Sequence, residues 1–210
     1  MNSQTKFWSE EFGNNYIRRN PMDLKSLNKS YLEKYGITRV NMNNLFLNKI
    51  NRNSKILEIG SSWGGQLAAL SKLGFRNLYG IDINDASLSV SKKISGINII
   101  KGDAQDIPFK DRYFDLVFTS GLLIHISPKF IRPITSEIYR CSKKYIWGFE
   151  YYSESYQSVE YRGNKNILWK ADFCKMYLEN FKELALIKSQ LFLYKDSADT
   201  DQMFLLKKKV

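Results

Sequence analysis

Three short motifs have residue types and spacing that suit the binding of a nucleotide-like molecule. Residues 60–65 read Gly-Ser-Ser-Trp-Gly-Gly, Asp82 follows Gly60 by 22 residues, and Asp103 follows Asp82 by 21. Glycine lets the backbone approach a ligand closely, and an acidic side chain at a strand end can accept hydrogen bonds from both hydroxyls of a ribose. The spacing is not that of the dinucleotide fingerprint, because Ser62 stands where that motif has glycine. The alternative is that both aspartates only cap the helices that follow them.

Alternating apolar runs and helical patterns must position these motifs. We predict strands over 55–60, 77–82, 97–101, 113–119 and 145–150, and helices over 64–73, 85–94 and 128–142. Such alternation predicts an α/β fold with a parallel sheet, which binds ligands beyond the carboxyl ends of its strands. Residues 150–167 look irregular; a helix over 170–181 and two strands, over 184–194 and 202–207, follow as an antiparallel hairpin at the sheet edge.

The chain divides into a covering segment and one binding domain. Residues 1–50 look helical, with 31–50 expected to pack on the sheet and the first 20 to form a lid, and residues 51–210 form the domain. Phe7, Trp8, Phe12 and Tyr16 recur at roughly helical spacing, which favours an apolar face packed on the core. A lid that closes would also exclude water from the site.

The motif Glu58-Ile59-Gly60 with Gly64 resembles the Glu-x-Gly-x-x-x-Gly form of class I methyltransferases. The resemblance implies S-adenosylmethionine as the cofactor and a Rossmann-like, mostly parallel seven-stranded sheet with helices on both faces. It also implies that Asp103 holds the adenine amino group beside Ala104, and that Glu58 supports the loop or places the cofactor's amino group. The expected cofactor-binding residues lie at the strand ends and in the first helices: Glu58, Gly60, Ser61, Ser62, Gly64, Asp82, Ile83, Asp103, Ala104, Ser120, Gly121, Tyr16 and Arg19.

Further segments resemble the methylases associated with pseudaminic acid biosynthesis, a branch of the class I methyltransferases. They comprise residues 7–20, Gly121-Leu122-Leu123-Ile124-His125-Ile126, Tyr139-Arg140-Cys141-Ser142 with Tyr145-Ile146, Glu150-Tyr151-Tyr152, Tyr161-Arg162-Gly163 and Lys170-Ala171-Asp172-Phe173. The match weakens over 199–204, and Trp63 in the cofactor loop departs from the pattern. The resemblance implies methyl transfer to an oxygen or nitrogen atom of a small polar metabolite, such as a sugar or a compound of sugar biosynthesis.

His125 is the one histidine of the chain and follows the fourth predicted strand, where an acceptor would meet the methyl group. An ordinary imidazole titrates near neutral pH, so His125 is a candidate general base, with a structural brace as the equal alternative. The expected substrate-binding residues follow the fifth strand: Glu150, Tyr151, Tyr152, Tyr161, Arg162 and Lys170. Because Arg162 suits bidentate contact with a carboxylate or phosphate, we expect the candidate substrates to include anionic compounds. The alternative to this substrate-binding role is structural. Tyr151 and Tyr152 would then be half-buried residues at the sheet edge, and Arg162 would pair with Glu160 or Glu150.

Composition limits the function classes. The formal charge of +11 suits nucleic acid, an anionic membrane surface or phosphorylated small molecules, but the basic residues are scattered, which favours a solvated surface. An RNA methyltransferase is one alternative, although Thr119-Ser120-Gly121-Leu122 does not resemble the catalytic Asn/Asp-Pro-Pro-Tyr. A non-catalytic cofactor-binding module is another. We predict no metal, no membrane span and a cytoplasmic protein, with Cys141 and Cys174 as buried thiols.

Overall fold

A seven-stranded sheet forms the centre of the protein in a computed structural model that describes residues 3–20 and 23–209. The strands run in the order β3-β2-β1-β4-β5-β9-β8. Strands β1 (Lys55–Ile59), β2 (Asn77–Asp82), β3 (Ile97–Lys101), β4 (Phe114–Ser120) and β5 (Ser142–Tyr151) are parallel. Strand β9 (Thr200–Lys208) is antiparallel to β5 and to the edge strand β8 (Leu184–Leu193). The predicted α/β class, the Rossmann-like order of strands and the antiparallel hairpin are confirmed.

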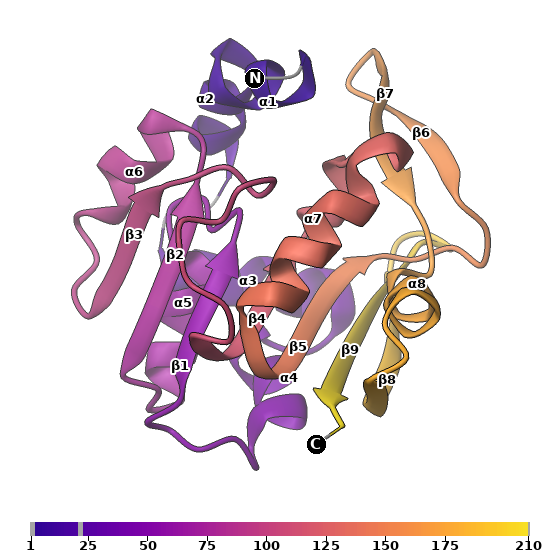
Figure 1. The fold of residues 1–210 in the computed structure, drawn as a ribbon. Helices are drawn as coiled ribbons and strands as arrows, with labels where there is room; N and C mark the ends of the chain where they lie inside the picture. The colour runs from indigo at the N-terminus through magenta and orange to yellow at the C-terminus, as the bar shows by residue number, and fades with distance from the viewer. Residues whose placement is uncertain (1–2, 21–22, 210) are drawn as a thin grey trace.

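Helices cover both faces of the sheet (Figure 1). Helix α3 (Leu24–Tyr35), α4 (Arg39–Leu47) and α5 (Gly65–Lys72) lie on one face, where Met42, Phe46 and Leu67 are buried in the same cluster as Trp147 of β5. Helix α7 (Pro128–Cys141) and α8 (Phe173–Asn180) cover the other face. Helix α6 (Asp85–Ser91) lies against β2 and β3. This burial on both faces explains why the parallel strands read as continuous apolar runs.

Two structures stand at the carboxyl ends of the parallel strands, at the top of Figure 1. One is the pair of short N-terminal helices, α1 (Ser3–Ser9) and α2 (Glu11–Arg19). The other is a hairpin of β6 (Gln157–Tyr161) and β7 (Asn164–Lys170), a separate two-stranded sheet where the sequence predicted irregular chain. A 3-10 turn, η1 (Leu123–His125), follows β4 and contacts β7. The helices and the hairpin therefore flank the edge where ligands of such sheets bind.

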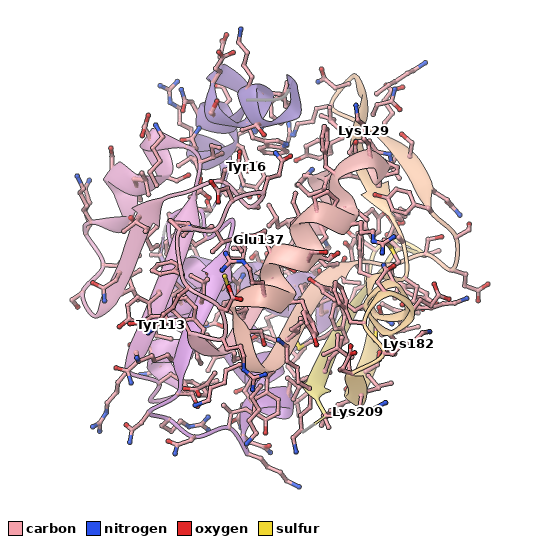
Figure 2. The ribbon with its side chains drawn as sticks, viewed as in Figure 1. Tyr16, Tyr113, Lys129, Glu137, Lys182 and Lys209 are labelled. Atoms are coloured by element: carbon pink, nitrogen blue, oxygen red, sulfur yellow. The ribbon has the colours of Figure 1, made fainter. Side chains whose placement is uncertain are left out.

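The basic side chains are spread around the molecule. Figure 2 shows Lys129 near the top of the view and Lys182 and Lys209 at its lower right, all pointing outward, whereas Tyr16 and Glu137 point inward. Both cysteines are buried free thiols. Across the described ranges, no helix has the length and apolar character that a bilayer crossing requires.

Candidate functional site

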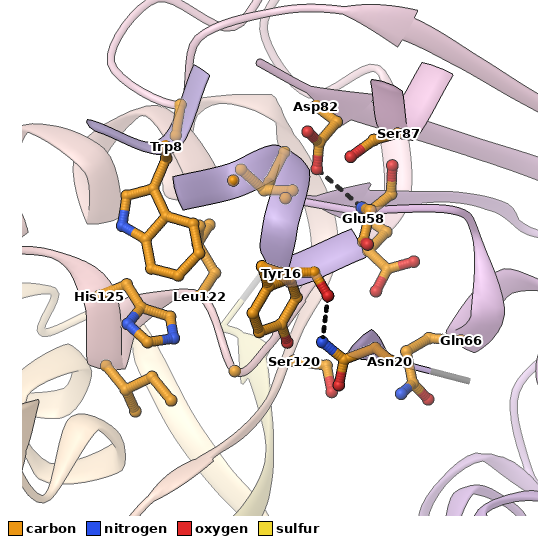
Figure 3. Close-up of a pocket in the computed structure, with 18 of the residues that line it drawn as sticks. Trp8, Tyr16, Asn20, Glu58, Gln66, Asp82, Ser87, Ser120, Leu122 and His125 are labelled. Carbon is orange, nitrogen blue, oxygen red and sulfur yellow. Dashed lines mark hydrogen bonds between the residues drawn. The ribbon is translucent and has the colours of Figure 1, made fainter. Parts of the chain in front are cut away.

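A cavity of about 710 Å³ opens at the carboxyl ends of the parallel strands (Figure 3). This volume lies in the range of small-molecule sites. Loops that follow β1, β2, β3 and β4 form one wall. Residues of the N-terminal helices, α3, the β6–β7 hairpin and the strands β5 and β9 also line the cavity. In Figure 3, Trp8 and His125 lie together on one side, and Asp82 and Glu58 lie on the opposite side.

The loop between β1 and α5 is tied to the end of β2. The backbone N–H groups of Gly60 and Ser61 both donate to the carbonyl oxygen of Ile81, at 2.9 and 3.0 Å. Gly64 precedes α5 with φ +91°, a left-handed conformation that glycine adopts without steric cost. Ser62 also has a positive φ, +50°, which is uncommon for a residue with a side chain. This backbone directs the Ser62 N–H to the Oδ2 atom of Asp82, 2.7 Å away.

Neither predicted acidic residue caps a helix. Asn84 caps α6, because its side chain accepts hydrogen bonds from the first turn, while Asp82 accepts from the backbone of Ser62 and of Asn84. Asp103 accepts from the backbone N–H of Gln105 at 2.9 Å, in a turn that leads to β4 with no helix between in the described chain. Both carboxylates line the cavity. They stand at the ends of the neighbouring strands β2 and β3.

Beneath this wall lies a group of buried polar atoms without hydrogen-bond partners. Glu58 is 1% exposed and its Oε2 atom has no partner among the described residues, and the same holds for the Oε1 atom of Gln66. Burial holds the pKa of Glu58 well above its ordinary value, although the positive charge of Arg39 counters this. Arg39 is fully buried over the ring of Phe149 and donates to the Tyr31 hydroxyl at 3.2 Å. Two lone acceptor oxygens facing a cavity suit a group with several N–H donors.

His125 is buried between the N-terminal helices and β7. Its Nδ1 atom lies 3.0 Å from the carbonyl oxygen of Ile167, which can only accept, so this nitrogen carries a hydrogen. Its ring lies 4.4 Å from the Trp8 ring and 5.9 Å from the Tyr161 ring. Burial lowers the pKa of His125 to about 4. The imidazole is therefore neutral at physiological pH.

The structure brings two of the expected substrate-binding residues to the cavity, Tyr151 and Tyr161. Glu150 points to the other side of β5, where it is buried and accepts hydrogen bonds from the N–H groups of Leu122 and Ile124, both at 3.3 Å. Burial raises the pKa of Glu150 to about 7. Glu150 thus supports the loop after β4 from below.

Tyr152, Arg162 and Lys170 are not among the residues that line the cavity. Arg162 is exposed in the turn between β6 and β7, next to the Tyr161 ring and without an ion pair to Glu160 or Glu150 in the described structure. Lys170 forms an ion pair with Asp199 at 2.6 Å and lies over the Tyr151 ring. Tyr152 is half-buried where β5 ends.

Nearly all of the expected cofactor-binding residues line the cavity: Glu58, Gly60, Ser61, Ser62, Asp82, Ile83, Asp103, Ala104, Ser120, Gly121 and Tyr16. Gly64 lies behind the loop, where a Cβ atom would come within 2.5 Å of Ile97. Arg19 is exposed and stacks on Phe12, while Asn20 lines the cavity instead. Of the N-terminal segment, residues 1–2 and 21–22 lie outside the described residues, as does residue 210.

Sequence reasoning did not find the polar residues that α3 and the C-terminal strands contribute. Lys34 and Tyr35 of α3, Tyr194 after β8 and Asp201 of β9 line one end of the cavity. They lie near each other only after folding, which pairs Asp201 with Tyr151 across β5 and β9. The local signal is an aspartate that shortly precedes the apolar run Met203 to Leu206.

A protein-family model matches the central part of the chain. The model of the methyltransferase domain family matches residues 57–146, which include the glycine loop, Asp82, Asp103 and the loop after β4. The match covers less than half of the chain. The expected cofactor, S-adenosylmethionine, agrees with this match and with the solved structures that share the fold.

Curated relatives match part of the chain. The chain is similar to the fatty-acid O-methyltransferase of Mycolicibacterium smegmatis, with 32% identity over 80 residues, 36% of this chain and 29% of that protein. It is also similar to the phosphoethanolamine N-methyltransferase of Plasmodium falciparum, with 32% identity over 83 residues, 38% of this chain and 31% of that protein. The chain thus matches less than a third of the length of these relatives.

Solved structures share the fold over most of the chain. A protein of Pyrococcus horikoshii OT3 superposes with a TM-score of 0.68 at 14% identity, over 93% of this chain and 99% of that one. An S-adenosylmethionine-dependent methyltransferase of Methanosarcina mazei superposes with a TM-score of 0.64 at 15% identity, over 79% of this chain and 97% of that one. The 1,6-didemethyltoxoflavin-N1-methyltransferase of Burkholderia thailandensis, solved with 1,6-didemethyltoxoflavin and S-adenosylhomocysteine, gives 0.65 at 12% identity, over 82% and 77%. At these identities the similarity establishes a Rossmann-like methyltransferase fold.

Proposed function

We propose that the protein transfers a methyl group from S-adenosylmethionine to an oxygen or nitrogen atom of a small polar metabolite. The observation that carries this proposal is one continuous cavity that joins the residues expected to hold the cofactor to a wall of tyrosines, a lysine and an aspartate. A polar, partly enclosed wall beside the cofactor site suits a small acceptor with several hydrogen-bonding groups. The resemblance to methylases of pseudaminic acid biosynthesis makes sugars and their biosynthetic relatives the first class to test.

The residues present fit S-adenosylmethionine. In this proposal Asp82 accepts from the ribose hydroxyls, Asp103 binds the adenine amino group beside Ala104, and the loop from Gly60 to Ser62 lies against the amino-acid end. The lone oxygens of Glu58 and Gln66 suit the ammonium group of that end, since an ammonium has three N–H donors and no acceptor. Ser120, Gly121, Ile83 and Tyr16 complete the wall of the cavity. The cofactor, when bound, supplies an activated methyl group on a sulfonium, and the protein positions the acceptor.

We assign His125 a positioning role in this reaction. A general base works best when its pKa is near the operating pH, and the low pKa of the buried imidazole makes it a weak base. Its hydrogen bond to β7 and its contact with the Trp8 ring instead hold together the loop after β4, the hairpin and helix α1. We further propose that residues 3–20 cover the site and open to admit ligands, because Trp8, Gly13, Tyr16 and Ile17 line the cavity.

Incubation with radiolabelled S-adenosylmethionine and separate pools of nucleotide sugars, small acids, amines and total RNA tests the proposal. We expect label in a small-molecule pool. Label in RNA would instead identify an RNA methyltransferase. Tight cofactor binding without turnover in any pool would identify a cofactor-binding module.

A further inference from the structure

One end of the cavity has a polar composition that the cofactor-binding residues do not account for. It consists of Lys34 and Tyr35 from the end of α3, Tyr151 at the end of β5, Tyr194 after β8 and Asp201 of β9; we call this group the α3–β9 cluster. Tyr151 and Asp201 are partners across β5 and β9. The ring of Tyr151 stacks parallel to the ring of Tyr194. The cluster lies at the far end of the sheet from Asp82 and Asp103, because three strands separate β2 from β9.

Asp201 presents a buried carboxylate to this cavity. Its side chain is 6% exposed, and the hydroxyls of Tyr35 and Tyr194 both donate to its Oδ2 atom, the latter at 2.9 Å. Among the described residues, the second oxygen, Oδ1, has no hydrogen-bond donor. Oδ1 is therefore an unpaired acceptor on a mostly buried side chain that lines the cavity, and it suits a ligand that brings an O–H or N–H group.

Lys34 places a positive charge on the same tyrosine. Its Nζ atom lies 3.6 Å from the centroid of the Tyr194 ring, a favourable cation–π position. No described carboxylate forms an ion pair with Lys34, although the negative charge of Asp201 attracts it. The neighbouring pair Lys170 and Asp199 neutralises itself at 2.6 Å. The cluster therefore carries a positive charge over the face of the Tyr194 ring and a negative charge at the hydroxyl of the same tyrosine.

We propose that the α3–β9 cluster is the acceptor subsite and that it takes a neutral, polyhydroxylated small molecule, an inference that rests on the function proposed above. A hydroxyl group is both donor and acceptor, so it can donate to Asp201 and accept from Lys34 at once. A carboxylate on the ligand is attracted by Lys34 but repelled by Asp201. An ammonium group is attracted by Asp201 but repelled by Lys34. This assignment differs from the anionic substrate that Arg162 and Lys170 suggested, because both of those side chains lie outside the cavity.

Three probes with the same sugar ring test the charge preference: neutral glucose, anionic glucuronate and protonated glucosamine. Each is titrated by calorimetry or NMR into protein saturated with S-adenosylhomocysteine. We expect glucose to bind best. Asp201→Asn should weaken glucose binding about tenfold, by loss of a hydrogen bond to a charged group, and should shift the preference to glucuronate. Lys34→Met should weaken it by a similar factor and shift the preference to glucosamine. Both variants should bind S-adenosylhomocysteine as the wild type does.

Lys55→Met is the matched control, because Lys55 also lies over a tyrosine ring, that of Tyr113 at 4.3 Å, but does not line the cavity. It should leave all three affinities unchanged, and thermal unfolding should verify that each variant folds. Wild-type preference for a charged probe, or no binding of any probe, overturns the proposal. Loss of S-adenosylhomocysteine binding in the Lys34 or Asp201 variant also overturns it and assigns the cluster to the cofactor. Label transfer to a small-molecule pool by the same preparation would show that the proposed function stands when the subsite assignment fails.

Discussion

Replacement of Asp82 by asparagine is the most direct test of the cofactor site. The two carboxylate oxygens accept backbone N–H groups, from Ser62 at 2.7 Å and from Asn84 at 2.9 Å. An amide retains one acceptor oxygen, so its NH2 group must face one of these donors. A hydrogen bond to a charged group contributes about 1.5–3 kcal/mol, and the partial exposure of Asp82 favours the lower end of this range. The unfolding midpoint without ligand should therefore fall by about 3–6 °C.

The same substitution should weaken cofactor binding separately from stability. If Asp82 accepts from the ribose, loss of one charge-assisted hydrogen bond raises the Kd for S-adenosylhomocysteine by about 10–150-fold, measured by calorimetry well below the unfolding midpoint. Asp85→Asn is the matched control, because Asp85 is exposed in the next turn and pairs with Lys101 at the surface. Its Kd should stay within about twofold, since exposed ion pairs contribute little. An unchanged Kd in Asp82→Asn would refute the assignment of the ribose site.

Three further substitutions have defined outcomes. His125→Asn keeps an N–H donor near the position of Nδ1, so it should retain most of the methyl-transfer rate. His125→Gln does not place a donor there and should lose most of that rate. A fall in rate of about 10²–10⁴ in both variants would instead identify a general base. Glu150→Gln should remove a pH dependence of stability. Because burial raises the pKa of Glu150 to about 7, its contribution to the free energy of unfolding is complete below pH 4.5 and is lost as the pH rises to about 7, by about 3 kcal/mol at most. The unfolding free energies of wild type and variant, measured with denaturant, should therefore diverge over this pH range. Parallel curves would contradict the burial argument. Gly64→Ala should destabilise the fold by more than Gly74→Ala, because both have φ near +90° but only Gly64 would bring a Cβ atom against Ile97. The shared backbone cost is about 1–2 kcal/mol, and equal unfolding free energies would show that the loop relaxes freely.

The core of the fold was predictable because local pattern and tertiary structure agree there. Residues 77–82 and 97–101 match β2 and β3 at both ends, since each strand is a short apolar run between turn-forming residues. The β6–β7 hairpin was missed for the opposite reason. Strand β6 is mostly exposed and polar, and β7 begins with three polar residues before its short buried run Ile167 to Trp169. Arg162 and Gly163 form the turn with positive φ values. Such a pattern carries no hydrophobic periodicity from which a strand could be read.

The cofactor side of the site was accessible from the sequence because consecutive strand ends bring it together. Most of its residues, from Gly60 to Gly121, come at or just after the end of a predicted strand, and parallel strands align these ends at one edge. The acceptor side has no such rule. Lys34 lies in the last turn of a helix that precedes the sheet, and Asp201 is the second residue of the last strand, 167 residues later in the sequence. Only the antiparallel insertion of β9 beside β5 brings them to one cavity.

The alternation of side chains along a strand separates the expected substrate wall into two parts. Glu150 and Tyr151 are adjacent in β5, so they point to opposite faces of the sheet. Phe149 and Tyr151 point toward α3 and the cavity, whereas Glu150 points toward α7 and the loop after β4. Because the Glu150 carboxylate meets backbone N–H groups on one face of the sheet, the next side chain, Tyr151, lies on the other face. Tyr151 therefore points into the cavity, and Glu150 holds the loop after β4 from the opposite face of the sheet.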